Sequence, residues 1–157
     1  MSNTQAPHQQ YNDGTAIKAI TSFSAKALLC DTSRYLVPMY QRNYAWGEGE
    51  INQLIQDVLD YQQSKPNQTY YIGTLVVFER KDDCFEVIDG QQRFTTLTLL
   101  AFALKRLSST NKSTVDMGWY NAPNLNFESR QKSSVTFERL FHRDAIKDLL
   151  TDEYNQD

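Results

Sequence analysis

A strand, a glycine turn and a helix follow one another without a linker in the middle of this chain of 157 residues. Residues 84–88 alternate as a half-buried strand does, with Glu86 on the opposite face from its two apolar neighbours. Residues 94–107 carry apolar side chains at helical spacing. Gly90 lies between the two segments and permits the sharp turn that so short a connection requires.

The predicted strand has a partner directly before it. Residues 70–78 are almost continuously apolar and β-branched or aromatic, which is typical of a strand buried on both faces. Only a polar turn at residues 80–83 separates the two strands, whereas a parallel crossover needs about a dozen residues. The two strands are therefore predicted to pair antiparallel.

Three further helices are predicted around this unit. They span residues 17–29 (in one or two pieces), 50–61 and 135–150, and the second has the clearest apolar stripe. A brief extended segment precedes Pro38, because proline holds the residue before it out of the helical region.

The chain is predicted to divide into three regions. Residues 1–14 are polar and are expected to form a mobile tail. Residues 15–110 form the core. Residues 111–157 form the third region. It contains most of a polar surface excursion at residues 108–124 and continues into a helical region that we expect to be truncated.

Composition excludes several classes of protein. Sixteen basic and nineteen acidic residues give a formal charge of −3, which excludes a generally basic nucleic-acid coat and disfavours autonomous DNA binding. No apolar run approaches the about 20 residues of a membrane span, and the N-terminus lacks the pattern of a secretory signal. The two cysteines, Cys30 and Cys84, form neither a disulfide framework nor a zinc motif. We therefore expect a cytoplasmic protein without a membrane partner.

The first segment with chemical potential is residues 37–46, where three aromatic residues surround Gln41 and Arg42. Aromatic rings such as that of Tyr40 can stack on a base, glutamine can read hydrogen bonds, and arginine can grip phosphate with its planar fork. Alternatively, the aromatic residues pin a loop to the core and Arg42 lies over them.

The second segment is the turn and helix start at residues 89–97. The first-turn amides of a helix have no acceptor within it, Arg93 adds a full charge, and Thr95 or Thr96 can supply a hydroxyl. This combination predicts a cradle for an anion or phosphate. Alternatively, Asp89 caps the helix and Arg93 pairs with a carboxylate.

These segments together resemble the N-terminal domain of GmrSD-type restriction enzymes. The resemblance lies in V-P-M-Y-Q-R-N-Y-A-W (37–46), Y-Y-I-G-T-L-V (70–76) and I-D-G-Q-Q-R-F-T-T-L (88–97), with a weaker block at residues 127–133. It implies an α/β fold of the ParB/sulfiredoxin-like kind, a small mixed sheet flanked by helices. It also implies a role in defence against phage DNA that carries modified bases or backbones.

The resemblance further implies a nucleoside triphosphate as ligand, with Mg²⁺ as its companion. Nucleotide-binding positions would be Tyr40, Gly90, Gln91, Gln92, Arg93 and Thr95. For hydrolysis, Gln41 would position water or read the base, Arg42 and Arg93 would clamp charge, and Asp89 would face the metal or hold an arginine. Gln91 stands where sulfiredoxins carry a catalytic cysteine, so thiol chemistry is not supported.

A nuclease centre is not expected in this chain. Enzymes of this type usually carry an HNH nuclease domain downstream, but the two histidines here are His8 and His142, with no histidine pair near an acid. The chain is then either a fragment of a longer effector or a separate sensor that works with a nuclease subunit. Its function is either nucleoside-triphosphate binding and hydrolysis as a regulatory module, or non-catalytic recognition of modified DNA or a partner subunit.

Overall fold

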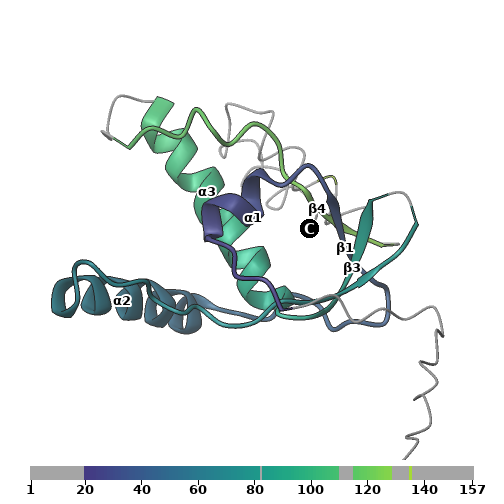
Figure 1. Ribbon diagram of the computed structural model, residues 1–157, viewed down its shortest axis with the longest axis horizontal. Helices are drawn as coiled ribbons and strands as arrows, with labels where there is room; N and C mark the ends of the chain where they lie inside the picture. The colour runs from purple at the N-terminus through teal and green to yellow at the C-terminus, as the bar shows by residue number, and fades with distance from the viewer. Residues whose placement is uncertain (1–19, 82, 110–114, 129–134, 136–157) are drawn as a thin grey trace, which may run out of the picture.

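The computed structural model describes residues 20–81, 83–109, 115–128 and 135 (Figure 1). The predicted tail at residues 1–14 and all but one residue of the predicted helix 135–150 lie outside this part. In chain order the elements are α1 (Ala25–Cys30), β1 (Arg34–Val37), α2 (Glu48–Ser64), β2 (Val76–Glu79), β3 (Cys84–Asp89), α3 (Gln91–Ser109) and β4 (Leu125–Phe127).

The four strands form one mixed sheet in the order β2-β3-β1-β4. β1 lies parallel to both β3 and β4, whereas β2 runs antiparallel to β3 with Phe78 opposite Glu86. The predicted antiparallel hairpin and the small mixed sheet are therefore confirmed. The parallel pairing of β1 with β3 brings the C-terminal ends of these two strands to the same edge of the sheet.

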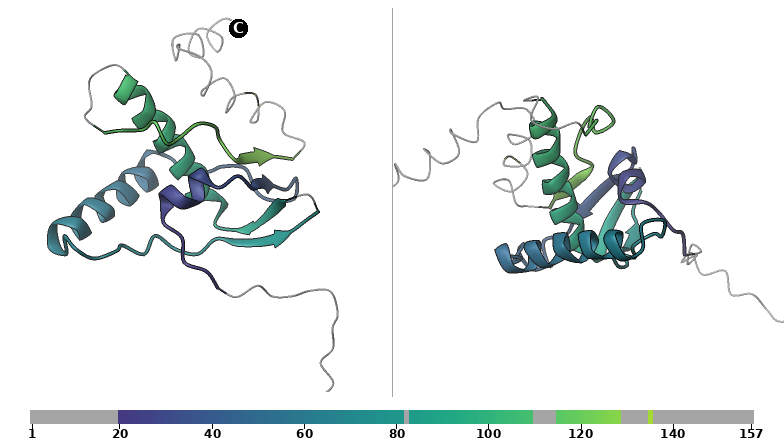
Figure 2. Two further views of the ribbon diagram at one scale, coloured as in Figure 1. Left: turned by 45° about the horizontal axis from the view of Figure 1, so that its top comes forward. Right: turned by 90° about the vertical axis from the view of Figure 1, so that its left-hand side faces the viewer.

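The core lies between one face of the sheet and the helices α1 and α3 (Figure 2). The Tyr35 ring meets the Phe94 ring edge-on, with 5.1 Å between their centroids. Alternation along each strand turns one set of side chains toward α3. The buried hydrophobic residues of this core are Leu29, Tyr35, Val37, Val87, Phe94, Ala101, Phe102, Met117, Tyr120, Leu125 and Phe127.

The expected strand at residues 70–78 is wrong in length and in burial. Only its last part is a strand, and all four residues of β2 are exposed, Phe78 to 54%. Gly73 interrupts the segment with a φ of +126°, a backbone conformation outside the strand region. The apolar run could not indicate that β2 occupies an edge of the sheet, because edge position depends on the other strands.

α3 begins at Gln91, three residues before the predicted start at 94. Its first two residues are glutamines with buried side chains, which the search for an apolar stripe could not include. The buried face also carries threonines. Thr96 and Thr98 donate to the carbonyls one turn earlier, at 2.8 and 2.9 Å, which satisfies their hydroxyls inside the core.

The predicted surface excursion at residues 108–124 is wrong for part of its length. Met117 and Tyr120 are buried in the core, and the Asn124 amide donates to the carbonyls of Leu28 and Asp31 at 2.8 and 3.1 Å. The excursion leads into β4, a strand of three residues that the sequence did not reveal. Residues past 110, where the predicted core ended, thus complete the sheet.

The first two helices differ in how closely their bounds match the predicted ranges. The N-terminal helix is limited to α1, and Ser24 caps it by accepting from the Ala27 N–H at 3.0 Å. The helix predicted at 50–61 is confirmed as the longer α2, which extends away from the sheet (Figures 1 and 2). Of the residues in its apolar stripe, Leu54 is buried, whereas Leu59 is 47% exposed.

Candidate functional site

A cleft of about 360 Å³ lies where the loop after β1 meets the turn between β3 and α3. Because β1 and β3 are parallel neighbours, their C-terminal ends deliver both connections to the same edge of the sheet, which is the usual binding edge of open α/β sheets. The residues that line the cleft are Gln41, Arg42, Trp46, Asp89, Gly90, Gln91, Gln92 and Arg93. The structure thus brings the two chemical segments of the sequence together.

Gly90 forms the turn with a φ of +90°, and its carbonyl accepts the first hydrogen bond of α3, from the Phe94 N–H at 3.0 Å. A Cβ added at Gly90 would lie 2.7 Å from the Thr74 carbonyl oxygen and 3.2 Å from Leu75 Cα. Gly90 was expected to permit a sharp turn and to be a nucleotide-binding position. In the structure its missing side chain makes room for the backbone of residues 74–75.

Arg93 is exposed at the start of α3, and its guanidinium lies against Gly73. A Cβ added at Gly73 would lie 2.9 Å from Arg93 Nη1 and 3.0 Å from Cζ. Gly73, within the Y-Y-I-G-T-L segment, therefore leaves room for this side chain. The alternative in which Arg93 pairs with a carboxylate is not what the structure shows, since Arg93 makes no ion pair within the described residues.

Gln91 and Gln92 fasten the loop after β1 to the start of α3. Gln91 Nε2 donates to the Arg42 carbonyl at 2.6 Å. Gln92 Nε2 donates to the Asn43 carbonyl at 3.1 Å, and its Oε1 accepts from the Ala45 N–H at 2.9 Å. Both amides, which were assigned to a nucleotide, are thus used at least in part to hold the loop that carries Arg42.

The other predicted site residues lie in three different surroundings. Gln41 lines the cleft and donates through Nε2 to the Ile88 carbonyl at 2.8 Å. Asp89 also lines the cleft, exposed, and its side chain makes no cap to α3 within the described residues. Thr95, only 2% exposed, is buried and is not among the cleft-lining residues, and Tyr40 lies outside the cleft as well.

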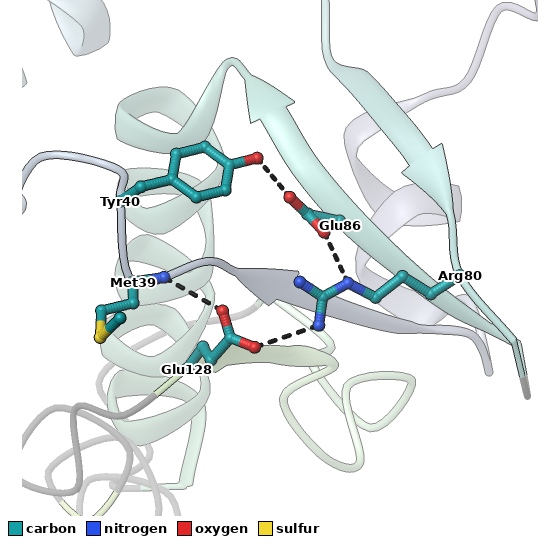
Figure 3. A network of polar contacts seen from close by, with 5 residues as sticks. All are labelled: Met39, Tyr40, Arg80, Glu86 and Glu128. Atoms are coloured by element: carbon teal, nitrogen blue, oxygen red, sulfur yellow. Dashed lines mark hydrogen bonds and ion pairs between the residues drawn. The ribbon is translucent and has the colours of Figure 1, made fainter.

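Tyr40 belongs to a polar network on the face of the sheet opposite α3 (Figure 3). Its hydroxyl donates to Glu86, which also pairs with Arg80 Nε at 2.5 Å. Arg80 Nη1 lies 3.1 Å from Glu128, whose second oxygen accepts from the Met39 N–H at 3.2 Å. No sequence pattern indicated this network, although the alternation along β3 placed Glu86 on that face.

The network shifts the titration of its members. The Tyr40 hydrogen bond lowers the pKa of the Glu86 carboxyl below its ordinary value, burial opposes the shift, and Arg80 adds to it. Hydrogen bonds from Arg80 and from the Met39 N–H likewise lower the pKa of Glu128. The same contact with Glu86 raises the pKa of Tyr40.

The charges around the cleft favour an anion. Two arginines, Arg42 and Arg93, and one carboxylate, Asp89, are among its lining residues. The N-terminus of α3, a helix of 19 residues, adds partial positive charge and backbone N–H donors. Within the ranges that the structure describes, no three His, Cys, Asp or Glu side chains are grouped as a metal site would require.

Comparison with known proteins places these features in a family. The family model described as GmrSD restriction endonuclease, N-terminal domain, matches residues 25–157, which include the cleft and the whole described sheet. The curated proteins give no match. Among the described helices, none is both long and apolar enough to cross a membrane. The resemblance predicted from the sequence motifs is confirmed, and the chain belongs to the family of GmrSD restriction endonuclease N-terminal domains.

Proposed function

We propose that this module of a restriction system binds a nucleoside triphosphate in the cleft at the start of α3 and hydrolyses it, as the regulatory step of a defence against modified phage DNA. The observation that carries the proposal is the convergence of Arg42, Arg93 and the N-terminus of α3 on one cleft. This positive site stands out because the chain as a whole carries a charge of −3.

The size and walls of the cleft suit a nucleotide. Its volume of about 360 Å³ falls in the range of small-molecule sites, which is about 300–1,000 Å³. Trp46 offers an aromatic wall on which a base could stack. Arginine guanidinium groups bind phosphate oxygens in a bidentate manner, so Arg42 and Arg93 would hold the triphosphate.

Asp89 fits the role of a magnesium-side carboxylate. Mg²⁺ in phosphoryl-transfer sites is held by one or two carboxylates together with the phosphates and water, so a single exposed carboxylate at the cleft suffices. The bound ion would neutralise charge on the phosphates. Gln41 would orient the attacking water, because its hydrogen bond to the Ile88 carbonyl fixes the plane of its amide beside the cleft.

Calorimetry on the purified chain with Mg²⁺ and each of ATP, GTP, CTP and UTP tests the proposal. Replacing Arg93 with alanine removes a charge-assisted contact worth about 1.5–3 kcal/mol, so the affinity should fall about ten- to a hundredfold. Arg34→Ala is the matched control, since Arg34 is exposed at the start of β1, away from the end that leads to the cleft.

Unchanged binding by Arg93→Ala, with the wild-type circular dichroism spectrum, would contradict the assignment. Saturable binding without release of phosphate would retain the site and reject hydrolysis. If no nucleotide binds and a modified DNA duplex does, the non-catalytic alternative replaces the proposal.

A further inference from the structure

We propose that Arg80, Glu86 and Glu128 are positioning residues, which hold the start of the loop after β1 from the outer face of the sheet and thereby place Gln41 and Arg42 at the cleft. The outer face is the face opposite α3, shown in Figure 3. The expected effect on nucleotide binding rests on the proposed function. The placement of the loop does not.

Glu86 is the centre of the network. It lies on β3, an inner strand of the sheet, opposite Phe78 of β2 and beside Leu36 of β1. It is 8% exposed, and a carboxylate with so little access to water needs partners that replace hydration. Arg80 and the Tyr40 hydroxyl supply them.

The loop residues of the network are otherwise exposed. Met39 and Tyr40 are 66% and 68% exposed, so neither is held in place by burial in the core. Their anchors are the hydrogen bonds from the Met39 N–H to Glu128 and from the Tyr40 hydroxyl to Glu86. Because the Tyr40 side chain is exposed, its hydroxyl, which donates to Glu86, is the group that holds it in place.

The position of Gln41 follows from this anchor. The Gln41 N–H donates to the carbonyl of the buried Pro38 at 3.1 Å, which closes a tight turn over Met39 and Tyr40. Gln41 then reaches the cleft, where its side chain donates to Ile88. Because the cleft-lining Gln41 directly follows the anchored Tyr40 in the chain, a shift of the turn would move Gln41 and Arg42.

The loop is thus fixed at two ends by two different sets of contacts. Gln91 and Gln92 hold its later part, residues 42–45, from the start of α3. Glu86 and Glu128 hold its beginning from the outer face, and Arg80 joins the two carboxylates. Removal of the outer-face contacts should loosen the cleft wall, while the hydrogen bonds of Gln91 and Gln92 keep the loop attached.

Fluorine NMR on the full chain labelled with 5-fluorotryptophan tests the inference without a ligand. The chain has two tryptophans, so two signals are expected. Trp46 lines the cleft, whereas Trp119 lies beside Lys26 of α1 and serves as an internal reference. A Trp119→Phe variant assigns the signals.

Tyr40→Phe and Glu128→Ala each remove one anchor of the turn. Glu128→Gln keeps an oxygen that can accept from the Met39 N–H and should restore much of the wild-type behaviour. Asp83→Asn is the matched control: it removes an exposed carboxylate from the turn between β2 and β3, and asparagine tolerates the φ of +52° at that position.

We expect Tyr40→Phe and Glu128→Ala to shift or broaden the Trp46 signal and to leave that of Trp119 in place. Their affinity for the nucleotide that binds wild type should fall about three- to tenfold, as after loss of one ordering hydrogen bond. A Trp46 signal that stays at its wild-type position in both variants overturns the inference, as does movement of both signals together.

A Trp46 shift without any loss of affinity, in a protein that binds nucleotide, also overturns the inference. If wild type binds no nucleotide but the Trp46 signal moves alone in both variants, the proposed function fails and the positioning role stands. The two failures are therefore distinguishable.

Discussion

At the residue scale, two glycines determine how the segment before β2 meets the start of α3. Gly90 lets the Thr74 carbonyl approach the turn, and Gly73 leaves room for the guanidinium of Arg93. Both have a positive φ, +90° and +126°, which side chains rarely tolerate. The segment before β2 and the turn before α3 can therefore pack closely because both glycines lack a side chain. The contact with Gly73 positions the Arg93 guanidinium.

Replacement of Gly73 by alanine should displace Arg93. The added Cβ would lie 2.9 Å from Nη1, so the guanidinium must move, and the backbone strain should lower the free energy of unfolding by about 1–3 kcal/mol. Nucleotide affinity should fall about tenfold, part of the loss expected for Arg93→Ala. Urea denaturation and calorimetry measure the two effects.

Gly49→Ala is the control for this variant. Gly49 lies in the first turn of α2, and an added Cβ would meet no atom within 4 Å. Alanine in a helix should raise the free energy of unfolding by about 0.4–1 kcal/mol and leave binding unchanged. Wild-type affinity in Gly73→Ala would show that nucleotide binding by Arg93 does not depend on its contact with Gly73.

The sequence predicted part of the site because its chemistry is local in the chain. Arg93, Gly90 and Asp89 occupy one turn, and turn chemistry can be read from adjacent residues. The orientation of Tyr40 toward the outer face could not be predicted, because it depends on Glu86, which is 46 positions away. Thr95 is one of the threonines on the buried face of α3, and an apolar pattern does not identify such residues.

At the element scale, the β2–β3 pairing could be predicted from the sequence and the parallel pairings could not. The reason is again that only the first is local in the chain. The hairpin joins neighbours in the sequence across a short turn, so its pairing could be predicted. The pairing of β1 with β4 joins Tyr35 to Leu125, and β4 has only three residues, too few for a recognisable pattern. The sheet becomes a four-stranded unit through contacts that local patterns do not reveal.

The network on the outer face should make stability depend on pH in the acid range. Glu86 and Glu128 have pKa values below the ordinary 4.5, so their ionised forms stabilise the folded state. This contribution is fully present above the unfolded-state pKa and is lost as the pH falls through the lower folded-state values. The free energy of unfolding should therefore decrease as the pH falls from about 5 to about 3.

Urea denaturation across this pH range checks the expectation. Glu86→Gln should flatten the acid dependence, because its amide does not titrate. Asp83→Asn, outside the network, should keep the wild-type profile. Identical profiles for Glu86→Gln and wild type would contradict a role of this carboxylate in acid stability.

At the scale of the whole molecule, the fold gathers positive charge at the cleft, although the net charge of the chain is negative. Parallel pairing of β1 and β3 places the loop with Arg42 and the turn before Arg93 at one edge of the sheet. The chain carries 19 acidic residues, yet among the described residues that line the cleft Asp89 is the one acidic residue. Under the proposed function, a ligand would thus be selected by a small positive site and not by an overall basic surface.

The chain by itself should release phosphate slowly from a nucleoside triphosphate and should not cleave DNA. Phosphoryl transfer relies on positioning and charge stabilisation, which Gln41, Arg42, Asp89 and Arg93 can supply. Asp89→Asn should lower phosphate release about tenfold or more, the scale of loss after weakening a metal contact, whereas Asp83→Asn should not.

The prediction that the chain does not cleave DNA rests on the described residues and on the sequence. They hold no group of three metal-ligating side chains, and the sequence places its two histidines at positions 8 and 142. Incubation of the purified chain with Mg²⁺ and modified phage DNA, with and without nucleotide, measures this directly. Cleavage that survives repurification and disappears in Asp89→Ala would mean that the cleft itself performs nuclease chemistry, and the separation of nucleotide hydrolysis from DNA cleavage would have to be abandoned.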